Sequence, residues 1–359
     1  MTLTSILDYA NIVEDFTGWT HEQWQDFRNN NPIQLASIGG SEAGTLLGYN
    51  SFKDEYTLYL EKIGEIVPQQ AGEAAEWGHI MEPIVAEQWM KKFGENLGIS
   101  IEEFSYLLQS KSHPFMLANI DRLARRGTEF GVLEIKTASE YLNGEWQNGE
   151  ILSDGSGDGK VPAKYYAQFQ HYLHVCGLSW GFFGALVGGN KLYSVYVERN
   201  QSFIDALIER ELLFTQRVEH RIPPELNSSD TCKELVSRLY KEHNENFREL
   251  KDESFAELIE KRAELKEMID IMDKGHKETI KPLEDELQLI ETQMKAQIAE
   301  DKGVTCKGWK VTWSTRSGRK TADVKLLEEK YPEVAAEVIK QGESYRQLSF
   351  AKPKVKKVK

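Results

Sequence analysis

Cysteines and long apolar segments are scarce in this sequence of 359 residues. Cys176, Cys232 and Cys306 lie far apart and lack partners at zinc-binding spacing, so neither a disulfide framework nor a zinc site is indicated. The sequence has no run of eighteen apolar residues, and its N-terminal segment lacks the charged, apolar and small-residue pattern of an export signal. We therefore expect a cytoplasmic protein without a membrane span.

Acidic residues outnumber basic ones, 57 to 44, which gives a formal net charge of −13. This charge argues against non-specific coating of nucleic acid, although an acidic protein can still hold DNA in a local basic channel. A hydrophobic content of 40%, with 10% aromatic residues, is enough for a buried core. The length allows two or three domains.

One stretch, residues 112–138, carries charges where strands are expected. An apolar run ends at Asp121, and after a short basic turn a second apolar run encloses Glu134 and Lys136. The pattern predicts two neighbouring strands. Because alternate residues of a strand share a face, the three charges are aimed at one point.

This group of charges is typical of a metal-dependent site. Asp121 and Glu134 would hold a hard divalent cation, Mg²⁺ or Mn²⁺ in its place, and the carbonyl of Ile135 would add a ligand. The Lys136 ammonium would orient a water molecule or balance the charge of a phosphate. The alternative is an exposed hairpin with surface ion pairs, but two charges inside an apolar strand are costly unless they are functional or paired.

A glycine-rich turn, Gly39-Gly40-Ser41, has the pattern of a phosphate cradle at the start of a helix. Glycines let the backbone approach an anion, the serine hydroxyl donates a hydrogen bond, and helix N-terminal amides attract negative charge. The alternative is a tight turn in which Ser41 is an ordinary helix cap.

Helical periodicity predicts two helices that present further polar groups. Residues 54–94 are expected to be helical, with Glu82 inside an apolar stripe, and a helix that begins at Pro162 carries Gln168 and Tyr172 on one face. The apolar stripe, which we expect to be buried, consists of Trp77, Ile80, Met81, Ile84, Val85 and Trp89.

The other elements of the N-terminal part complete a mixed α/β fold. Residues 140–159 are expected to form a mobile loop, 181–187 and 192–197 a β-hairpin, and 204–218 a helix. We therefore predict a domain over residues 1–225 that has a mixed sheet with flanking helices.

The C-terminal part has a different texture. Residues 232–300 are strongly charged, with apolar residues at heptad-like spacing, and interruptions at Gly275 and Pro282 favour a helical hairpin over a single rod. Residues 301–350 indicate a small α+β module, and 351–359 form a basic tail. The elements expected in the module are strands at 310–315 and 344–350 and a helix at 324–341.

Together these motifs resemble a known family. The acid pair with Lys136 resembles the PD-(D/E)XK nuclease core, and residues 20–220 are similar to the YqaJ-type viral recombinase family, phage exonucleases related to lambda exonuclease. The further matching motifs are W-x-x-x-R at Trp24 and Arg28, W-G-x-x-x-E ending at Glu82, and Q-x-x-x-Y at Gln168 and Tyr172. Arg122 stands where related enzymes often have glycine, and Asn29 to Gln34 is an insertion relative to the lambda spacing.

The resemblance implies roles for individual residues. The implied catalytic residues are Asp121, Glu134, Lys136, Glu82 and Gln168. The implied metal ligands are Asp121, Glu134, Ile135 and Glu82. The residues expected to bind DNA or its 5′-phosphate are Ser41, Gly40, Arg28, Trp24 and Tyr172.

The activity implied by the resemblance is Mg²⁺-dependent degradation of one strand of duplex DNA from a 5′ end. The product would be a 3′ overhang for a single-strand annealing protein, and the enzyme would be a homo-oligomeric ring, such as a trimer, in the cytoplasm of a bacterial host, with a phage or prophage origin. The alternatives are a structure-specific endonuclease with the same core, and a catalytically silent DNA-binding or scaffold protein.

Overall fold

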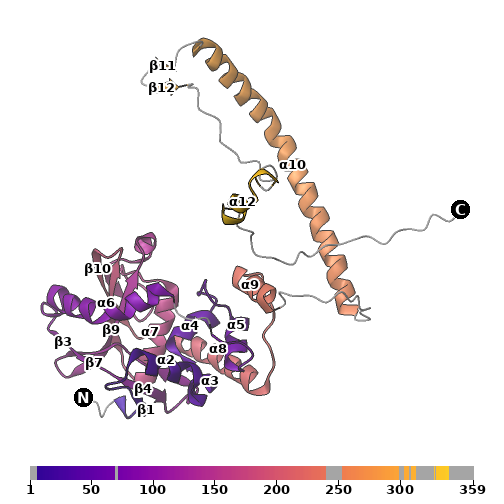
Figure 1. The fold of residues 1–359 in the computed structure, drawn as a ribbon. Coiled ribbons are helices and arrows are strands. Elements are labelled where there is room, and N and C mark those ends of the chain that lie inside the picture. Colours follow the sequence, from indigo (N-terminus) through magenta and orange to yellow (C-terminus); the bar gives the residue numbers. More distant parts are fainter. Residues whose placement is uncertain are drawn as a thin grey trace. The chain divides into compact units, whose positions relative to one another are not determined.

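In a computed structural model the chain forms two compact units, Met1–Tyr240 and Lys241–Lys359 (Figure 1). The structure describes residues 6–68, 72–239, 253–298, 303–306, 309–312, 327 and 329–338. The first unit extends past the predicted boundary at residue 225, because the helix α9 (Asp230–Leu239) contacts α5 (Glu55–Lys62) and buries Cys232 and Leu235. No helix in these ranges is both long and apolar enough to cross a bilayer.

The first unit is built on two mixed sheets, which confirms the predicted fold class. A four-stranded sheet has the order β1 (Ala10–Asp15), β4 (Tyr106–Ser110), β5 (Met116–Ala118), β2 (Ile38–Gly39). A six-stranded sheet has the order β3 (Ile99–Glu103), β6 (Arg122–Arg126), β7 (Glu129–Ala138), β9 (Trp180–Val187), β10 (Lys191–Glu198), β8 (Gly149–Ile151). The strand β7 pairs antiparallel with β6 and parallel with β9.

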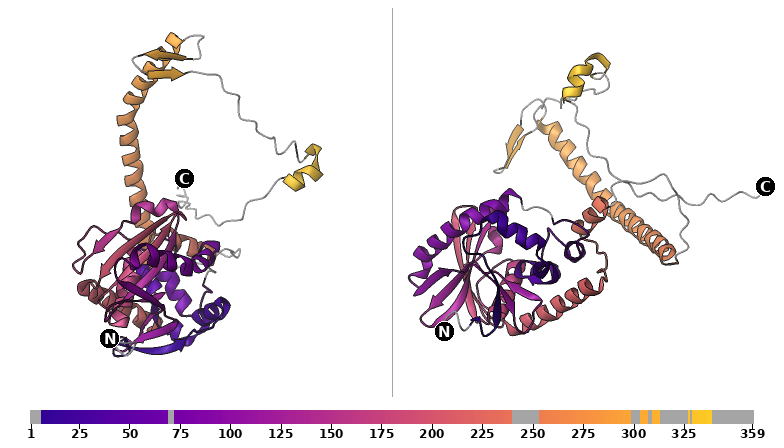
Figure 2. Two further views of the ribbon diagram at one scale, coloured as in Figure 1. Left: turned by 90° about the vertical axis from the view of Figure 1, so that its left-hand side faces the viewer. Right: turned by 60° about the horizontal axis from the view of Figure 1, so that its bottom comes forward.

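Helices flank both faces of the six-stranded sheet (Figure 2). On one face α6 (Glu73–Trp89) packs on Leu133 and Ile135 of β7, and on the other α7 (Ala163–Cys176) packs on Val132. This division follows from the alternation of side chains along a strand. The helices are α2 (His21–Asn30), α3 (Pro32–Ala36), α4 (Gly40–Leu46), α5 (Glu55–Lys62), α6 (Glu73–Trp89), α7 (Ala163–Cys176), α8 (Gln201–His220) and α9.

The helix α7 has the ends that its sequence predicts. It begins directly after Pro162, and it ends at Gly177, which has a left-handed φ of 65° and caps the last turn. A fully buried pair, His171 and Glu211, ties α7 to α8 with Nδ1 and Oε1 2.8 Å apart, and the other ring nitrogen bonds the carbonyl of Leu117 at 2.9 Å. These contacts hold α7 rigidly beside β5 and the site described below.

Two predictions for residues 54–94 are wrong. The expected single helix is interrupted between α5 and α6, where Gly64 adopts a φ of 76°. The buried stripe also lies elsewhere than expected: Val85 and Trp89 are buried, but Trp77 is 56% exposed, and Ile80 and Ile84 are about half exposed. The spacing marks one side of the helix, yet the sheet covers only the part of that side where Val85 and Trp89 lie.

The segment 140–159 is not the irregular loop that its composition predicts. It contains a 3₁₀ turn, Glu140–Glu145, and the short strand β8, which pairs parallel with β10. The predicted hairpin is confirmed as β9 and β10, and the predicted helix at 204–218 lies within α8.

The second unit contains one long helix rather than the predicted hairpin. The helix α10 (Glu253–Ile298) runs for 46 residues through both Gly275 and Pro282. A glycine costs a helix interior about 1 kcal/mol, and a proline can bend a helix without ending it, so neither residue enforces a turn. The strands β11 (Gly303–Cys306) and β12 (Trp309–Thr312) form an antiparallel pair, and α12 covers Pro332–Val338. The expected strand at 344–350 and the tail at 351–359 lie outside the described residues.

Candidate active site

The site begins where the pairing of β6 with β7 ends. Arg122 of β6 lies opposite Leu133, so Asp121, just before β6, comes level with Glu134 on the neighbouring strand. Beyond this point β7 has no partner on the β6 side, and the Asp121 Oδ2 accepts the backbone N–H of Ile135 at 2.7 Å. The Asp121 carboxylate therefore accepts the hydrogen bond that a backbone carbonyl of a longer β6 would accept. The pairing of β6 with β7 thereby keeps Asp121 next to Glu134.

Glu134 is the most deeply buried acid of this group, with 1% of its surface exposed. Its Oε1 accepts hydrogen bonds from Lys136 Nζ at 2.8 Å and from Gln168 Nε2 at 2.9 Å. The Gln168 amide also lies 2.9 Å from the hydroxyl of Tyr172, one turn further along α7. The other oxygen, Oε2, is buried and has no hydrogen-bond partner in the described part of the chain. A buried carboxylate oxygen without a partner is costly, and a bound cation would satisfy it.

The electrostatics of the site favour a bound positive charge. Burial raises the pKa of Glu134 to about 8, and repulsion from Asp121 adds to this rise. Burial also raises the pKa of Asp121, and burial with repulsion from Asp121 raises the pKa of Glu82. Burial alone would lower the pKa of Lys136, but attraction to Glu134 and Asp121 outweighs it and raises that pKa. Lys136 therefore stays an ammonium ion at neutral pH.

Glu82 lies at the edge of this group and is paired with an arginine. Its Oε1 accepts from Arg122 at 2.7 Å, and the same guanidinium nitrogen donates to the Asp121 carbonyl at 2.6 Å. The side chain of Arg122, the residue after Asp121, therefore binds both the backbone carbonyl of Asp121 and the carboxylate of Glu82. Nothing in the sequence indicated this contact, because Glu82 and Arg122 are 40 positions apart.

The residues fit a hard divalent cation through two acids rather than three. Within the described ranges no group of three or more His, Cys, Asp and Glu side chains is placed to hold a metal ion. Asp121 and Glu134 are close, mutually repulsive and buried, and Glu134 has an oxygen without a partner. Carboxylate oxygens of this kind are the ligands that Mg²⁺ and Mn²⁺ prefer, so the acid pair fits such an ion while Glu82 is engaged by Arg122.

The glycine-rich turn forms the opposite wall of the site. Ser41 Oγ accepts from Arg28 at 2.8 Å, and the Arg28 guanidinium lies 5.2 Å from the centre of the Trp24 ring. Gly39, not Ser41, is the N-cap of α4, so the alternative of Ser41 as an ordinary cap is wrong. A Cβ at Gly40 would lie 2.4 Å from the Tyr172 ring, so only glycine lets α4 approach α7 this closely.

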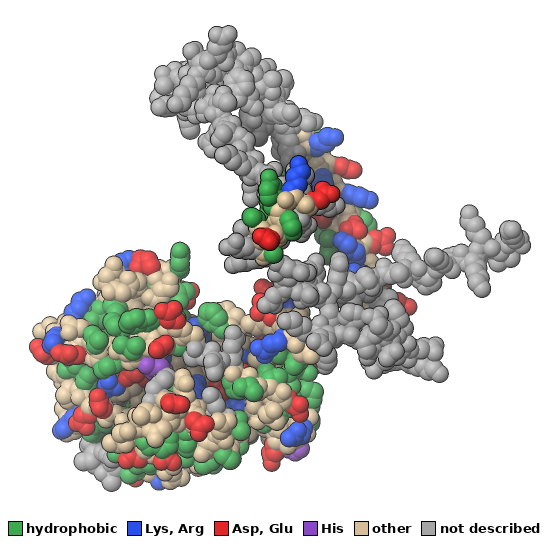
Figure 3. Space-filling model, in the orientation of Figure 1, with side chains coloured by type: hydrophobic (Ala, Val, Ile, Leu, Met, Phe, Trp, Pro, Cys, Tyr) green, Lys and Arg blue, Asp and Glu red, His purple; other side chains and the backbone are tan. Residues whose placement is uncertain are grey.

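A cavity of about 690 Å³ joins these two walls. It is lined by the acid pair and Lys136 at one end and by the Arg28 and Ser41 pair at the other. Figure 3 shows that one face of this unit is hollowed and that acidic and basic side chains mix there. The predicted site residues that line the cavity are Trp24, Arg28, Gly40, Ser41, Glu82, Asp121, Glu134, Lys136, Gln168 and Tyr172. Ile135 meets the site through its backbone N–H.

The cavity is also lined by residues that the sequence did not single out. His79 is three residues before Glu82 on α6, a helical spacing that was a usable signal. Lys62 donates to the carbonyls of Gln34 and Ser37 at 2.8 and 2.6 Å and pairs with Glu42 at 2.9 Å. These contacts lie 20 to 28 residues apart in sequence, so no local pattern reveals them.

Comparison with known proteins gives a match to one family and to one curated relative. Residues 23–179 match the family described as the YqaJ-like viral recombinase domain. Over 213 residues the chain is 34% identical to the uncharacterized protein YqaJ of Bacillus subtilis (strain 168). The aligned region covers 58% of this chain and 62% of that protein. The chain therefore spans less than two thirds of that relative.

Two solved structures are similar over part of the chain. The alkaline exonuclease LHK-Exo of Laribacter hongkongensis shares 15% identity over 61% of this chain and 98% of its own, with a TM-score of 0.39. The same exonuclease in complex with dAMP shares 14% identity over 58% of this chain and 96% of its own, with a TM-score of 0.38.

Proposed function

We propose that this chain is a metal-dependent deoxyribonuclease that degrades one strand of duplex DNA from a 5′ end, and the match of residues 23–179 to the YqaJ-like viral recombinase domain supports this proposal. The observation that carries this proposal is that one cavity holds a buried acid pair with a lysine facing an arginine and a serine. One end has the groups for phosphodiester hydrolysis, and the other has the groups for a terminal phosphate.

In this mechanism Asp121 and Glu134 would hold Mg²⁺ or Mn²⁺, with the Ile135 carbonyl as a further ligand. The ion, when bound, polarises the scissile phosphate and lowers the pKa of bound water. Glu82 would join the ligands once Arg122 leaves it, which frees the guanidinium for the phosphate backbone.

The remaining groups of the site would stabilise the charge that develops on the phosphate and hold Glu134 in position. Lys136 is an ammonium at neutral pH, so it serves as a fixed positive charge for the developing phosphorane and not as a general base. Gln168 orients Glu134 through its amide, and Tyr172 fixes that amide in turn. Burial, with repulsion from Glu134, raises the pKa of Tyr172, which keeps the phenol neutral.

At the other wall Arg28 and Ser41 would bind the 5′-phosphate, with Trp24 below the guanidinium and Gly40 leaving room for Tyr172. Arginine forms strong charge-assisted hydrogen bonds with phosphate oxygens. The resemblance to the family supports two further parts of the proposal: the 3′ overhang passes to a single-strand annealing protein, and the enzyme assembles as a homo-oligomer, such as a trimeric ring.

One assay tests the activity, the requirement for an end and the direction together. Linear duplexes labelled at the 5′ or the 3′ end, a nicked circle and a closed circle are incubated with Mg²⁺, Mn²⁺ or EDTA. We expect cleavage only of linear DNA with a divalent ion, with early release of the 5′ label as mononucleotides. Cutting of the closed circle would identify an endonuclease, and binding without cutting would identify a silent DNA-binding protein.

Variants connect the assay to the acid pair. Asp121→Asn keeps an oxygen that can accept the Ile135 N–H, and Glu134→Gln keeps one that can accept from Lys136, so both variants should fold but lose hydrolysis. Glu87→Gln is the matched control, because Glu87 is an exposed acid of α6 outside the cavity. Normal cleavage in either site variant would refute the assignment of the acid pair.

A further inference from the structure

Phe52 is an exposed aromatic residue at the edge of the cavity. It lies between α4 and α5, and 81% of its surface is exposed although its neighbours Asn50 and Lys53 line the cavity. A ring exposed at the rim of a polar cavity offers a flat apolar face on which a planar ligand can stack.

The loop that carries Phe52 has a defined shape. Asn50 Nδ2 donates to Thr45 Oγ1 at 2.9 Å, and the backbone N–H of Phe52 donates to Asn50 Oδ1 at 3.0 Å. Asp54 then caps α5 by accepting from the N–H of Thr57 at 2.9 Å. The ring is therefore presented from a loop fixed at both ends, which lowers the entropy cost of binding a ligand to it.

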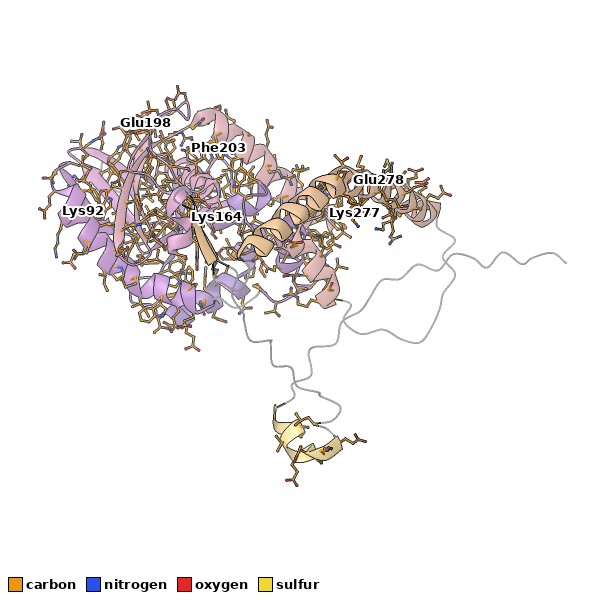
Figure 4. All side chains as sticks on the ribbon, turned by 90° about the horizontal axis from the view of Figure 1, so that it is seen from above. Lys92, Lys164, Glu198, Phe203, Lys277 and Glu278 are labelled. Atoms are coloured by element: carbon orange, nitrogen blue, oxygen red, sulfur yellow. The ribbon has the colours of Figure 1, made fainter. Side chains whose placement is uncertain are left out.

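A lysine from another element lies beside this ring. This lysine, Lys164, is labelled in Figure 4 and lies in the first turn of α7. Its Nζ is 5.2 Å from the centre of the Phe52 ring and 4.9 Å from that of Tyr165. Within the described residues no carboxylate lies within ion-pair distance of it. A Cβ at Gly44 would lie 2.9 Å from Lys164 Cα, so this glycine is what brings α4 and its loop so near to α7.

The same series of contacts continues to the acid pair. Lys136 Nζ lies 5.1 Å from the centre of the Tyr165 ring, and it bonds Glu134 at 2.8 Å. Aromatic rings and ammonium groups thus alternate from the exposed Phe52 through Lys164 and Tyr165 to the centre of the site. Alternating rings and cations are the features with which proteins bind single-stranded nucleic acid, by stacking on bases and contacting phosphates.

We propose that Phe52, Lys164 and Tyr165 form a binding track for a single strand of nucleic acid that leads to the acid pair. A base stacks on the face of Phe52, and an adjacent backbone phosphate binds Lys164. A base within a duplex keeps both faces stacked on its neighbours, so the open ring fits an unpaired base. The identity of the strand as substrate rests on the proposed nuclease function, but its binding does not require cleavage.

The test measures binding of the full-length chain to a fluorescent twelve-nucleotide oligothymidylate in EDTA, over a series of salt concentrations. Phe52→Ala should weaken binding roughly 5- to 150-fold, the range expected when one stacked base is lost. Phe52→Trp should restore it. Lys164→Gln should lower the slope of log affinity against log salt by about 0.7, the value for one phosphate contact on a single strand. An oligonucleotide with one abasic position should bind more weakly to the wild type and equally to Phe52→Ala.

Matched controls come from the same unit. Tyr141→Ala removes an almost fully exposed ring that takes no part in this series of contacts, and Lys92→Gln removes a lysine whose Nζ lies 5.0 Å from the centre of the Phe93 ring. Both should bind like the wild type.

If Phe52→Ala and Lys164→Gln bind like these controls, the track is refuted. A loss in Phe52→Ala that is equally large for blunt duplex would refute the preference for a single strand. Comparing the wild type with Phe52→Ala separates the two proposals. If Phe52→Ala weakens binding but the wild type does not cleave DNA, only the nuclease proposal is overturned. If the wild type cleaves DNA but Phe52→Ala binds as tightly as the wild type, only the track is overturned.

Discussion

Replacing Glu134 with glutamine should remove a large part of the pH dependence of folding in the metal-free protein. The folded-state pKa of this acid is about 8, against 4.5 for the free side chain. Between these values the folded chain keeps the proton and the unfolded chain releases it. The stabilisation by this proton is therefore fully present below pH 4.5 and is lost as the pH rises through 8.

The size of the effect follows from the pKa difference. A difference of one bound proton between the folded and unfolded states changes the unfolding free energy by about 1.4 kcal/mol per pH unit, so wild type should lose about 3 kcal/mol more than Glu134→Gln between about pH 5.5 and 8. In the wild type Lys136 keeps its proton throughout this range because attraction to Glu134 and Asp121 raises its pKa. Titrating groups that do not interact with residue 134 cancel in the comparison of the two proteins.

The measurement is a urea titration at a series of pH values in EDTA, followed by tryptophan fluorescence. Glu87→Gln, which changes an exposed acid of the same unit, should follow the wild type. Adding Mg²⁺ at pH 8 should stabilise wild type, because a cation that binds only the folded state raises its stability, and should have little effect on Glu134→Gln. Parallel pH profiles for wild type and Glu134→Gln would refute the reasoning.

Three further predictions concern the ends of DNA, the sheet and the second unit. Ser41→Ala should reduce the preference for 5′-phosphorylated over 5′-hydroxyl duplex by about tenfold, as expected for a charge-assisted hydrogen bond, and equal wild-type rates on both ends would contradict a phosphate role. Gly181→Ala should destabilise the protein by about 3 kcal/mol or more in urea titrations, because its Cβ would lie 2.2 Å from the Val132 carbonyl oxygen, whereas Gly144→Ala has open space and should be neutral. A fragment of residues 1–240 should fold and keep metal-dependent cleavage, since it contains every cavity residue, and a folded fragment that does not cut DNA would refute this division.

The central residues of the site were predictable because they are local. Asp121, Glu134 and Lys136 lie within sixteen positions on two neighbouring strands, where alternation alone decides which side chains meet. Gln168 and Tyr172 follow from helical spacing in the same way. The structure places these residues around one cavity, as the short patterns of charge inside apolar runs predict.

Other features depend on contacts that no local pattern encodes. The pairing of Glu82 with Arg122 and the anchoring of Lys62 join residues from separate elements, so they emerge only when the sheets and helices assemble. The exposed position of Trp77 has a similar cause, because periodicity gives the side of a helix but not the width of the surface that covers it. The continuous α10 shows that glycine and proline set a cost for a helix and do not by themselves end it.

The alternation along β7 also makes correct folding a condition for the site to exist at all. Glu134 faces α7, whereas Leu133 and Ile135 pack into the core beneath α6. If the strand slipped by one residue, both charges of the site would enter that apolar core, and two aliphatic side chains would face Gln168 in their place. Such a slip is strongly disfavoured, so the strand register that buries the core also assembles the acid and lysine groups, and a misfolded sheet with a working site is not available to this chain.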